Sequence, residues 1–187
     1  NGKFHVTLKE RDLTRLGEGG LARNRLTRAA IRRADEVLRR YAATVRYCQV
    51  DHVEAVATSA IRDAANGRAF VRRVRQRLGL PLRIISGPEE ARLIYLGVAQ
   101  AQRRRQAKLL ITIGGGSAQV VVGERAHLRY RSSVPLGGAR LAQRFIRHDP
   151  PTSEELAALT REIELRWRPL AAAIRHHRWH HAVGSSA

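Results

Sequence analysis

Three consecutive glycines and a serine at positions 114–117 separate two short apolar runs, 109–113 and 120–122. Each run is too short for an ordinary helix and is rich in branched side chains, so the pattern predicts two strands joined by a glycine-rich turn. One interpretation is structural, because Gly-Gly accepts the positive φ angles of a tight hairpin. The other is chemical: successive N–H groups and the Ser117 hydroxyl can converge on an anion such as phosphate. No Walker A lysine and no helix follow the glycines, so two common phosphate loops are excluded.

Glu90 is the second residue whose position could support chemistry. It follows Gly87 and Pro88, which predict a helix cap and a first helical position. A carboxylate in the first turn of a helix is stabilised by the helix dipole, and helix capping explains it structurally. The same carboxylate could orient or deprotonate a water molecule for attack on phosphorus.

Arg62 is the third, because it follows two hydroxyl residues, Thr58 and Ser59, at the end of an expected strand. Hydroxyl groups and a guanidinium beside a strand end suit the capture of phosphate. The structural alternative is a helix cap at Ser59 followed by a surface arginine.

Four histidines lie within residues 176–181, and His177 and His181 have the spacing of two metal ligands on one helix face. No carboxylate is close in sequence, and Trp179 indicates packing. We therefore predict no metal site in this segment.

Hydrophobic periodicity predicts the elements that hold these residues. The capping pattern of the last expected helix is Ser153 with Leu156, where glutamate would be ideal. The Asn1-Gly2 dipeptide predicts a turn whose earlier strand would precede the chain, so we expect a fragment. Beside the two hairpin strands, the expected helices are 26–47, 64–78, 87–101, 138–147 and 153–175, and the expected strands are 4–8, 53–60, 82–86, 127–137 and 180–187.

Composition limits the class of protein. The chain has 187 residues, of which 43% are hydrophobic, so it can form a substantial core. Its net charge of +19 favours polyanionic partners, and its basic residues other than Lys3, Lys9 and Lys108 are arginines. Cys48 is the single cysteine and excludes an internal disulfide, and no apolar stretch is long enough to span a membrane. We therefore expect a cytoplasmic protein with no membrane partner.

Three stretches together resemble the Ppx/GppA phosphatase family of exopolyphosphatases and guanosine pentaphosphate phosphohydrolases: "ATSAIRDAANG", "ISGPEEARLIYLGV" and "IGGGS". The resemblance implies an α/β fold of the actin-like (ribonuclease H-like) ATPase type, with two subdomains and a phosphate-binding cleft between them. It further implies that residues 1–101 are the remainder of the first subdomain, 102–107 a linker and 108–187 the start of the second. The family's phosphate chains bind in that cleft, usually with Mg²⁺.

By position, the resemblance assigns Glu90 as the residue that activates the attacking water. It assigns Arg62 as a phosphate-binding arginine, and Gly115, Gly116 and Ser117 as the second phosphate-binding hairpin. The family's first phosphate hairpin would lie before Asn1, and the ending "AVGSSA" resembles the start of a longer family segment, so we expect truncation at both ends.

Two positions depart from the family pattern, which reads Asp-Ile-Gly-Gly-Gly-Ser-Thr-Glu at the hairpin. Thr112 stands at the position of the aspartate and Gln119 at that of the glutamate. Both are neutral and are weaker Mg²⁺ ligands than carboxylates. The chain is therefore expected to bind phosphate and to hydrolyse phosphoanhydrides slowly.

The resemblance implies release of terminal phosphate from polyphosphate or from the guanosine alarmone pppGpp. The alternative is a weakly active or inactive relative that binds polyphosphate or the alarmone and acts through a partner. A homodimer is left open. A nucleic-acid-binding module would depend on charge alone and is not expected.

Overall fold

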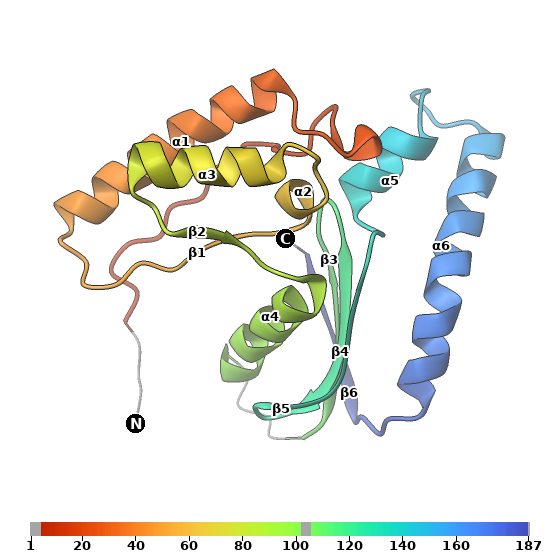
Figure 1. Ribbon diagram of the computed structural model, residues 1–187. Helices are drawn as coiled ribbons and strands as arrows, with labels where there is room; N and C mark the ends of the chain where they lie inside the picture. The colour runs from red at the N-terminus through yellow and green to blue at the C-terminus, as the bar shows by residue number, and fades with distance from the viewer. Residues whose placement is uncertain (1–4, 102–105, 187) are drawn as a thin grey trace.

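The computed structural model describes residues 5–101 and 106–186. The first half of the described chain contains a two-stranded sheet with two long helices on one side of it (Figure 1). Strands β1 (Ala55–Ala57) and β2 (Leu82–Ile84) run in parallel, and helices α1 (Arg28–Tyr47) and α3 (Gly67–Leu78) cover them. Two short helical segments, η1 (Leu21–Arg23) and α2 (Ser59–Arg62), lie near the ends of these elements. The apolar face of α3 and small residues of α1 enclose the core, which includes Ala34, Phe70, Val71, Val74 and Leu82.

The second half is built on a four-stranded sheet with the order β5-β4-β3-β6. The glycine hairpin joins β3 to β4, which are antiparallel, and β6 pairs with β3 in parallel. The strands are β3 (Lys108–Ile113), β4 (Ala118–Glu124), β5 (His127–Val134) and β6 (His181–Ser186), and the helices are α4 (Gly87–Ala101), α5 (Gly138–Phe145) and α6 (Ser153–Arg175).

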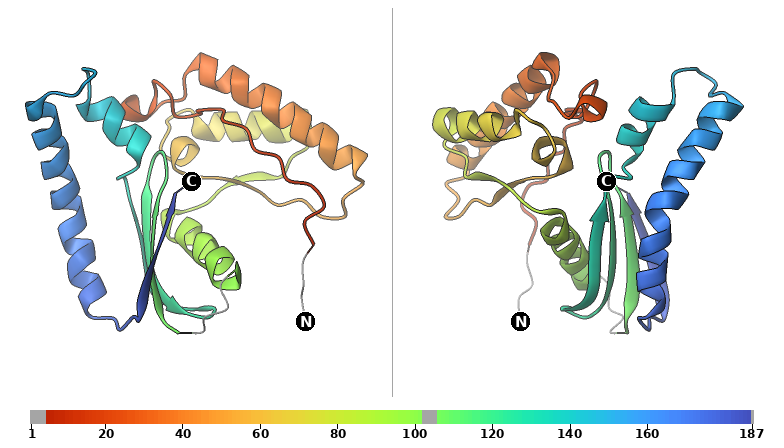
Figure 2. Two further views of the ribbon diagram at one scale, coloured as in Figure 1. Left: turned by 180° about the vertical axis from the view of Figure 1, so that it is seen from behind. Right: turned by 45° about the vertical axis from the view of Figure 1, so that its right-hand side comes forward.

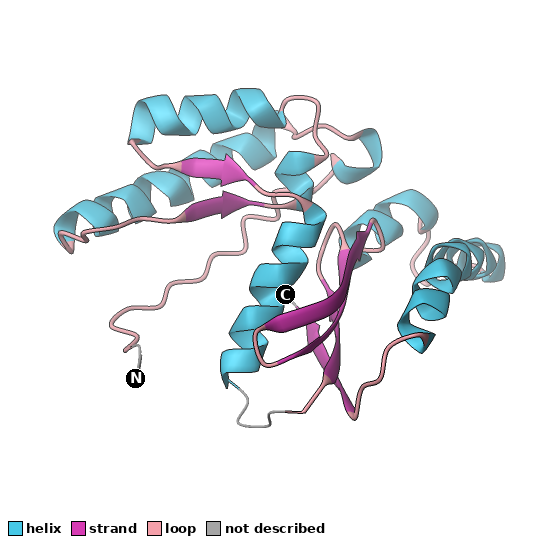
Figure 3. Cartoon of the chain, turned by 60° about the horizontal axis from the view of Figure 1, so that its bottom comes forward, coloured by secondary structure: helices cyan, strands magenta, loops and turns pink. Residues whose placement is uncertain are grey.

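Strand alternation assigns the two faces of this sheet to different helices, because successive side chains point in opposite directions. Leu109 packs with Leu170 and Ile174 of α6, whereas Leu110 packs with Ala91 and Tyr95 of α4. Figure 2 shows α4 and α6 on opposite sides of the sheet. In Figure 3, α4 lies between the two sheets, so its first turn faces the space where the two halves meet.

The predicted elements other than the strand at 4–8 are present, but several have different limits. The helix expected at 26–47 starts at Arg28, and the strand expected at 82–86 ends at Ile84. The strand expected at 53–60 ends at Ala57, because α2 starts at Ser59. The strand expected at 127–137 ends at Val134, directly before Pro135, which has no N–H to donate. The helices expected at 64–78 and 138–147 are shorter, since α3 starts at Gly67 and α5 ends at Phe145.

The strand expected at 4–8 is not formed by residues 5–8, which are exposed and pair with no described strand. A single strand without a partner leaves its backbone groups to water, which explains the irregular segment. Phe4 and the Asn1-Gly2 turn lie outside the described residues. So do residues 102–105 of the expected linker, and the division into 1–101, 102–107 and 108–187 stays a prediction.

None of the helices in the described ranges combines the length and the hydropathy needed to cross a membrane.

The start of α6 is capped one residue earlier than predicted. Thr152, not Ser153, is the N-cap, and Glu155 supplies the reciprocal bond that was missing at Leu156. The Glu155 carboxylate accepts hydrogen bonds from the N–H groups of Thr152 (3.1 Å) and Arg147 (2.9 Å). Burial raises the pKa of the Glu155 carboxyl, but these bonds and the nearby His148 ring outweigh it and lower the pKa to about 2.

Glu155→Gln should therefore destabilise the chain in a pH-dependent way. The ordinary pKa of this carboxyl is 4.5, so the ionised group stabilises the fold fully above that pH and loses its contribution as pH falls toward about 2. Urea unfolding should show the variant less stable than the parent at pH 7, with the difference shrinking below pH 4.5. Glu164→Gln, at an exposed position of the same helix, is the control and should show no such trend. An equal deficit at pH 7 and pH 3 would contradict the assigned role.

Candidate functional site

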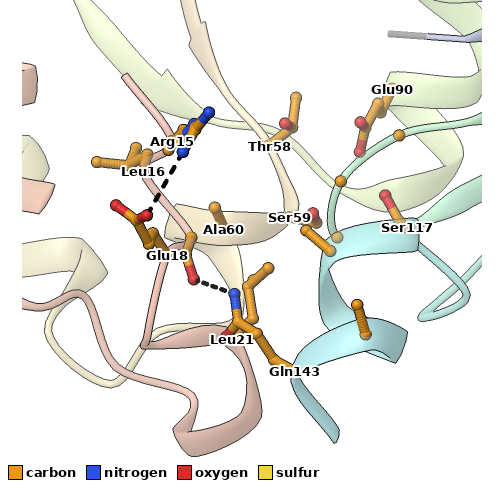
Figure 4. Close-up of a pocket in the computed structure, with 16 residues that line it drawn as sticks. Arg15, Leu16, Glu18, Leu21, Thr58, Ser59, Ala60, Glu90, Ser117 and Gln143 are labelled. Atoms are coloured by element: carbon orange, nitrogen blue, oxygen red, sulfur yellow. Dashed lines mark hydrogen bonds and ion pairs between the residues drawn. The ribbon is translucent and has the colours of Figure 1, made fainter. Parts of the chain in front are cut away.

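A cavity of about 580 Å³ opens where the two halves of the chain meet (Figure 4). The first half contributes the loop 15–18 and residues 58–60, and the second contributes the glycine hairpin and helix α5. Glu90, in the first turn of α4, also lines it. The expected cleft thus coincides with a cavity bordered by the hairpin.

The hairpin carbonyl groups are held by the start of α5. The Gly114 carbonyl accepts from the N–H of Gly138 and the Gly115 carbonyl from the N–H of Arg140, both at 2.9 Å. The Gly116 carbonyl accepts from Nε of Arg140 at 2.8 Å. Each of the three glycines is therefore anchored to the same short helix.

The hairpin N–H groups differ from the hairpin carbonyl groups in their hydrogen bonding. The N–H of Gly114 closes the turn by donating to the Ser117 carbonyl at 2.9 Å. The N–H groups of Gly115 and Gly116 have no acceptor among the described residues, and both glycines line the cavity. Two adjacent donors without acceptors beside a cavity are a suitable site for an anion.

Close approach, and not backbone conformation, is what requires glycine at position 116. Neither Gly115 nor Gly116 has a positive φ, so the structural interpretation of the glycines as a positive-φ turn is wrong. A Cβ at Gly116 would lie 2.1 Å from Oγ of the buried Ser59. One at Gly137 would lie 2.3 Å from the Gly116 carbonyl carbon. The hairpin is thus pressed between α2 and the segment before α5.

Arg62 and Glu90 meet because each follows one of two parallel strands. β1 leads into α2 and β2 leads into α4, and the carboxyl ends of parallel strands lie at the same edge. Nη1 of Arg62 lies 2.9 Å from Oε2 of Glu90 and 3.2 Å from the carbonyl oxygen of Ile85. The side chains are only 20% and 12% exposed, so the ion pair is largely shielded from water.

Glu90 lies in the first turn of α4 as expected, but the capping roles given as structural alternatives are wrong. Ser86, not Gly87, is positioned as the cap of α4, since its Oγ accepts from the N–H of Glu89 at 3.2 Å, and Glu90 points to Arg62 instead. Ser59 is the first residue of α2 and not its N-cap. Arg62 is partly buried in an ion pair and is not a surface arginine.

Ser117 is shared between two cavities. The larger one contains the hairpin and Glu90, and a neighbouring one of about 440 Å³ contains Arg62, Arg140 and Ser133. The structure therefore gathers all five residues predicted to bind phosphate or activate water. Arg62 differs from the other four in lining only the neighbouring cavity.

Thr112 and Gln119 face each other across the β3–β4 pair, on the face of the sheet that carries α4. Both are buried, at 4% and 2% exposure. Nε2 of Gln119 donates to Oγ of Ser117 at 2.8 Å, so the amide takes part in holding the hairpin. Oγ1 of Thr112 has no hydrogen-bond partner in the part of the chain that the structure describes.

The side chains near the hairpin do not suit a divalent cation. Thr112 offers a hydroxyl and Gln119 an amide, and the nearby carboxylate of Glu90 is paired with Arg62. Within the ranges that the structure describes, no three His, Cys, Asp or Glu side chains are grouped as metal ligands. Of the two histidines considered as ligands, His177 packs on Tyr130 with ring centroids 5.6 Å apart, and His181 starts β6.

Three contributors were missed by sequence reasoning. The loop 15–18 belongs to no expected helix or strand, and Arg140 and Gln143 were expected only as parts of the helix 138–147. Gln143 donates to the carbonyl of Gly17 at 3.1 Å and so connects α5 to that loop. The one signal in the sequence was the Gly137-Gly138 pair directly before the helix, which indicates a close approach of the backbone.

Comparison with known proteins gives a consistent result. The sequence profile of the Ppx/GppA phosphatase family matches residues 1–187. The chain is similar to an exopolyphosphatase from Cytophaga hutchinsonii, with 30% identity and a TM-score of 0.91 over 98% of this chain and 59% of that one. It is also similar to a Ppx/GppA family member from Aquifex aeolicus, with 31% identity and a TM-score of 0.75 over 98% of this chain and 58% of that one. The expected actin-like α/β fold is confirmed, and the chain spans less than two thirds of these relatives.

Proposed function

The chain belongs to the Ppx/GppA phosphatase family, and on that premise we propose that it binds a phosphate chain at the Gly114–Ser117 hairpin and hydrolyses its terminal phosphoanhydride bond. The observation that carries the proposal is the pair of unaccepted N–H groups at Gly115 and Gly116, in a cavity that Glu90 also lines. Polyphosphate and pppGpp both present the required terminal phosphate. The site favours neither.

Glu90 and Arg62 have complementary parts in the proposed reaction. The terminal phosphate is held by the hairpin N–H groups and attracts the Arg62 guanidinium, which is bound to Glu90 when no ligand is present. A water oxygen attacks the terminal phosphorus, its proton passes to the Glu90 carboxylate, and the bridging P–O bond breaks. The leaving oxygen takes the bonding electrons and departs on the shortened chain.

Slow turnover is part of the proposal. Phosphoryl transfer needs positive charge around the oxygens of the transferred group, which metal ions usually supply. The uncharged side chains of Thr112 and Gln119 provide little support for a cation. The same lack of charged ligands supports a second candidate function, that of a weakly active or inactive relative that binds phosphate chains and acts through a partner.

We also propose a cytoplasmic location for this protein. Homodimerisation stays a prediction.

Arg62→Ala tests the binding site. The variant loses a charge-assisted bond to phosphate, so its polyphosphate affinity should fall about 10- to 100-fold in calorimetric titrations. Arg72→Ala, at an exposed position of α3, removes the same charge and should change the affinity little. Binding by the parent should also weaken steeply with added salt, because phosphate contacts release counterions.

The proposal is contradicted if Arg62→Ala binds like the parent while Arg72→Ala does not. Arg62→Lys keeps the charge and separates loss of charge from loss of the guanidinium geometry. Thermal unfolding of each variant checks that the fold is intact, since Arg62→Ala leaves Glu90 without its ion-pair partner.

A further inference from the structure

Arg140 contacts three segments that are far apart in the sequence. Its Nε donates to the carbonyl of Gly116 at 2.8 Å, and its Nη2 forms an ion pair with Asp63. Nη1 lies 3.5 Å from the side-chain oxygen of Asn24. The Arg140 side chain is only 13% exposed and its bond to Gly116 is partly buried, whereas its contacts with Asp63 and Asn24 lie at the surface.

The Gly116 carbonyl is held differently from the other two glycine carbonyls of the hairpin. The backbone N–H groups of α5 hold the carbonyls of Gly114 and Gly115, but the Gly116 carbonyl is held by the side chain of Arg140. Gly116 is also the glycine that approaches Ser59 most closely. The bond from Arg140 fixes the peptide group that joins Gly116 to Ser117, so the direction of the Ser117 N–H depends on one guanidinium.

Asp63 connects the Arg140 guanidinium to Arg62 and Glu90, the two residues with proposed roles in the reaction. Oδ1 of Asp63 lies 3.5 Å from Nε of Arg62, and Arg62 is paired with Glu90. The contacts form a continuous series from Glu90 through Arg62, Asp63 and Arg140 to Gly116. That series crosses from the α2–α4 side of the cleft to the hairpin side.

We propose that Arg140 is a positioning residue that fixes the hairpin N–H groups relative to Arg62 and Glu90, with Asp63 as its anchor. The phosphate-binding consequence rests on the proposed function, whereas the fixing of the hairpin does not. Arg140 acts through Gly116 and Asp63 and needs no contact with the substrate.

The polyphosphate affinity of an Asp63 variant distinguishes the positioning role of Arg140 from a purely electrostatic one. Asp63→Asn removes a negative charge near the proposed anion site, so an account based on charge alone predicts tighter polyphosphate binding. Positioning predicts weaker binding, about 10-fold, because the anchor of Arg140 is lost. Since Asp63 acts on the hairpin through Arg140, Arg140→Gln combined with Asp63→Asn should speed hairpin exchange no more than Arg140→Gln alone.

The test begins with amide hydrogen exchange of the chain without any ligand. Arg140→Gln should speed exchange about 10-fold at Gly114 and Gly138, whose N–H groups donate to the Ser117 and Gly114 carbonyls, and leave the β4 amides at 120–122 at the parent rate. Arg144→Gln, on the same helix and 55% exposed, is the matched control and should leave the hairpin unchanged. Arg140→Lys keeps the charge but cannot span both partners, so it should resemble Arg140→Gln.

Each outcome decides the proposal. Unchanged hairpin exchange in Arg140→Gln and Arg140→Lys overturns it, as does uniform acceleration that includes β4, or tighter polyphosphate binding by Asp63→Asn. If Arg140→Gln does not fold, Arg140→Lys and Asp63→Asn still give the exchange result. Should the parent chain not bind polyphosphate while hairpin exchange rises as expected, positioning by Arg140 stands and the proposed function fails.

Discussion

Gly116→Ala is expected to abolish polyphosphate binding at concentrations that saturate the parent chain. The added methyl carbon would lie 2.1 Å from Oγ and 3.2 Å from Cβ of Ser59. Ser59 is buried at 5% exposure in α2, and rotation of its hydroxyl would still leave its Cβ only 3.2 Å from the added methyl carbon. The hairpin must shift instead, which displaces the N–H groups that we propose bind the terminal phosphate. Calorimetric titration with polyphosphate measures the loss.

Two companion variants control for this effect. Gly115→Ala adds the same methyl group one residue earlier, where the nearest neighbour is Cβ of Ala139 at an ordinary 3.8 Å, and should bind like the parent. Ser59→Gly introduced with Gly116→Ala removes both clashing atoms and should restore part of the affinity. Binding by Gly116→Ala at the parent affinity would show that the hairpin is not the phosphate site.

Glu90→Gln is expected to lower phosphate release from polyphosphate by about 10²- to 10⁴-fold, the usual contribution of a general base. The amide is nearly the same size and stays beside Arg62, but it cannot accept the proton of the attacking water. Release of phosphate at saturating polyphosphate measures the loss, and calorimetry should show that binding is retained. Equal hydrolysis by the parent and the variant would refute the role of Glu90.

Thr112→Asp combined with Gln119→Glu should act in the opposite direction. The pair supplies two carboxylates beside the hairpin, so phosphate release is expected to rise when Mg²⁺ is added. Adding Glu90→Gln should remove that gain. A gain that persists without Glu90 would mean that another residue activates the water.

Local patterns were sufficient to predict the parts of the site that depend on neighbours in sequence. Apolar runs on both sides of the glycines predicted β3 and β4, and Pro88 with Glu90 predicted the start of α4. The hydroxyl residues at the end of β1 drew attention to Arg62, which lies beside Glu90 in the structure. These features arise from alternation, helix dipoles and backbone freedom, which act within a few residues.

Contacts between distant segments could not be predicted in this way. Asp63 and Arg140 are 77 residues apart, and nothing in either local sequence indicates their pairing. The close approach of Gly116 to Ser59 likewise depends on how the two halves pack. Residues 5–8 alternate as a strand would, yet alternation without a pairing partner does not form one.

The most direct test of the central claim is the response of individual backbone amides to a short phosphate chain. In ¹H–¹⁵N spectra of the chain titrated with tripolyphosphate, the largest shifts are expected at Gly115, Gly116 and Ser117, and they should saturate together. The arginine-rich outer faces of α1 and α3 should respond weakly and lose their response in added salt. Large saturable shifts on α1 and α3, with the hairpin amides unmoved, would contradict the assignment of the hairpin as the phosphate site.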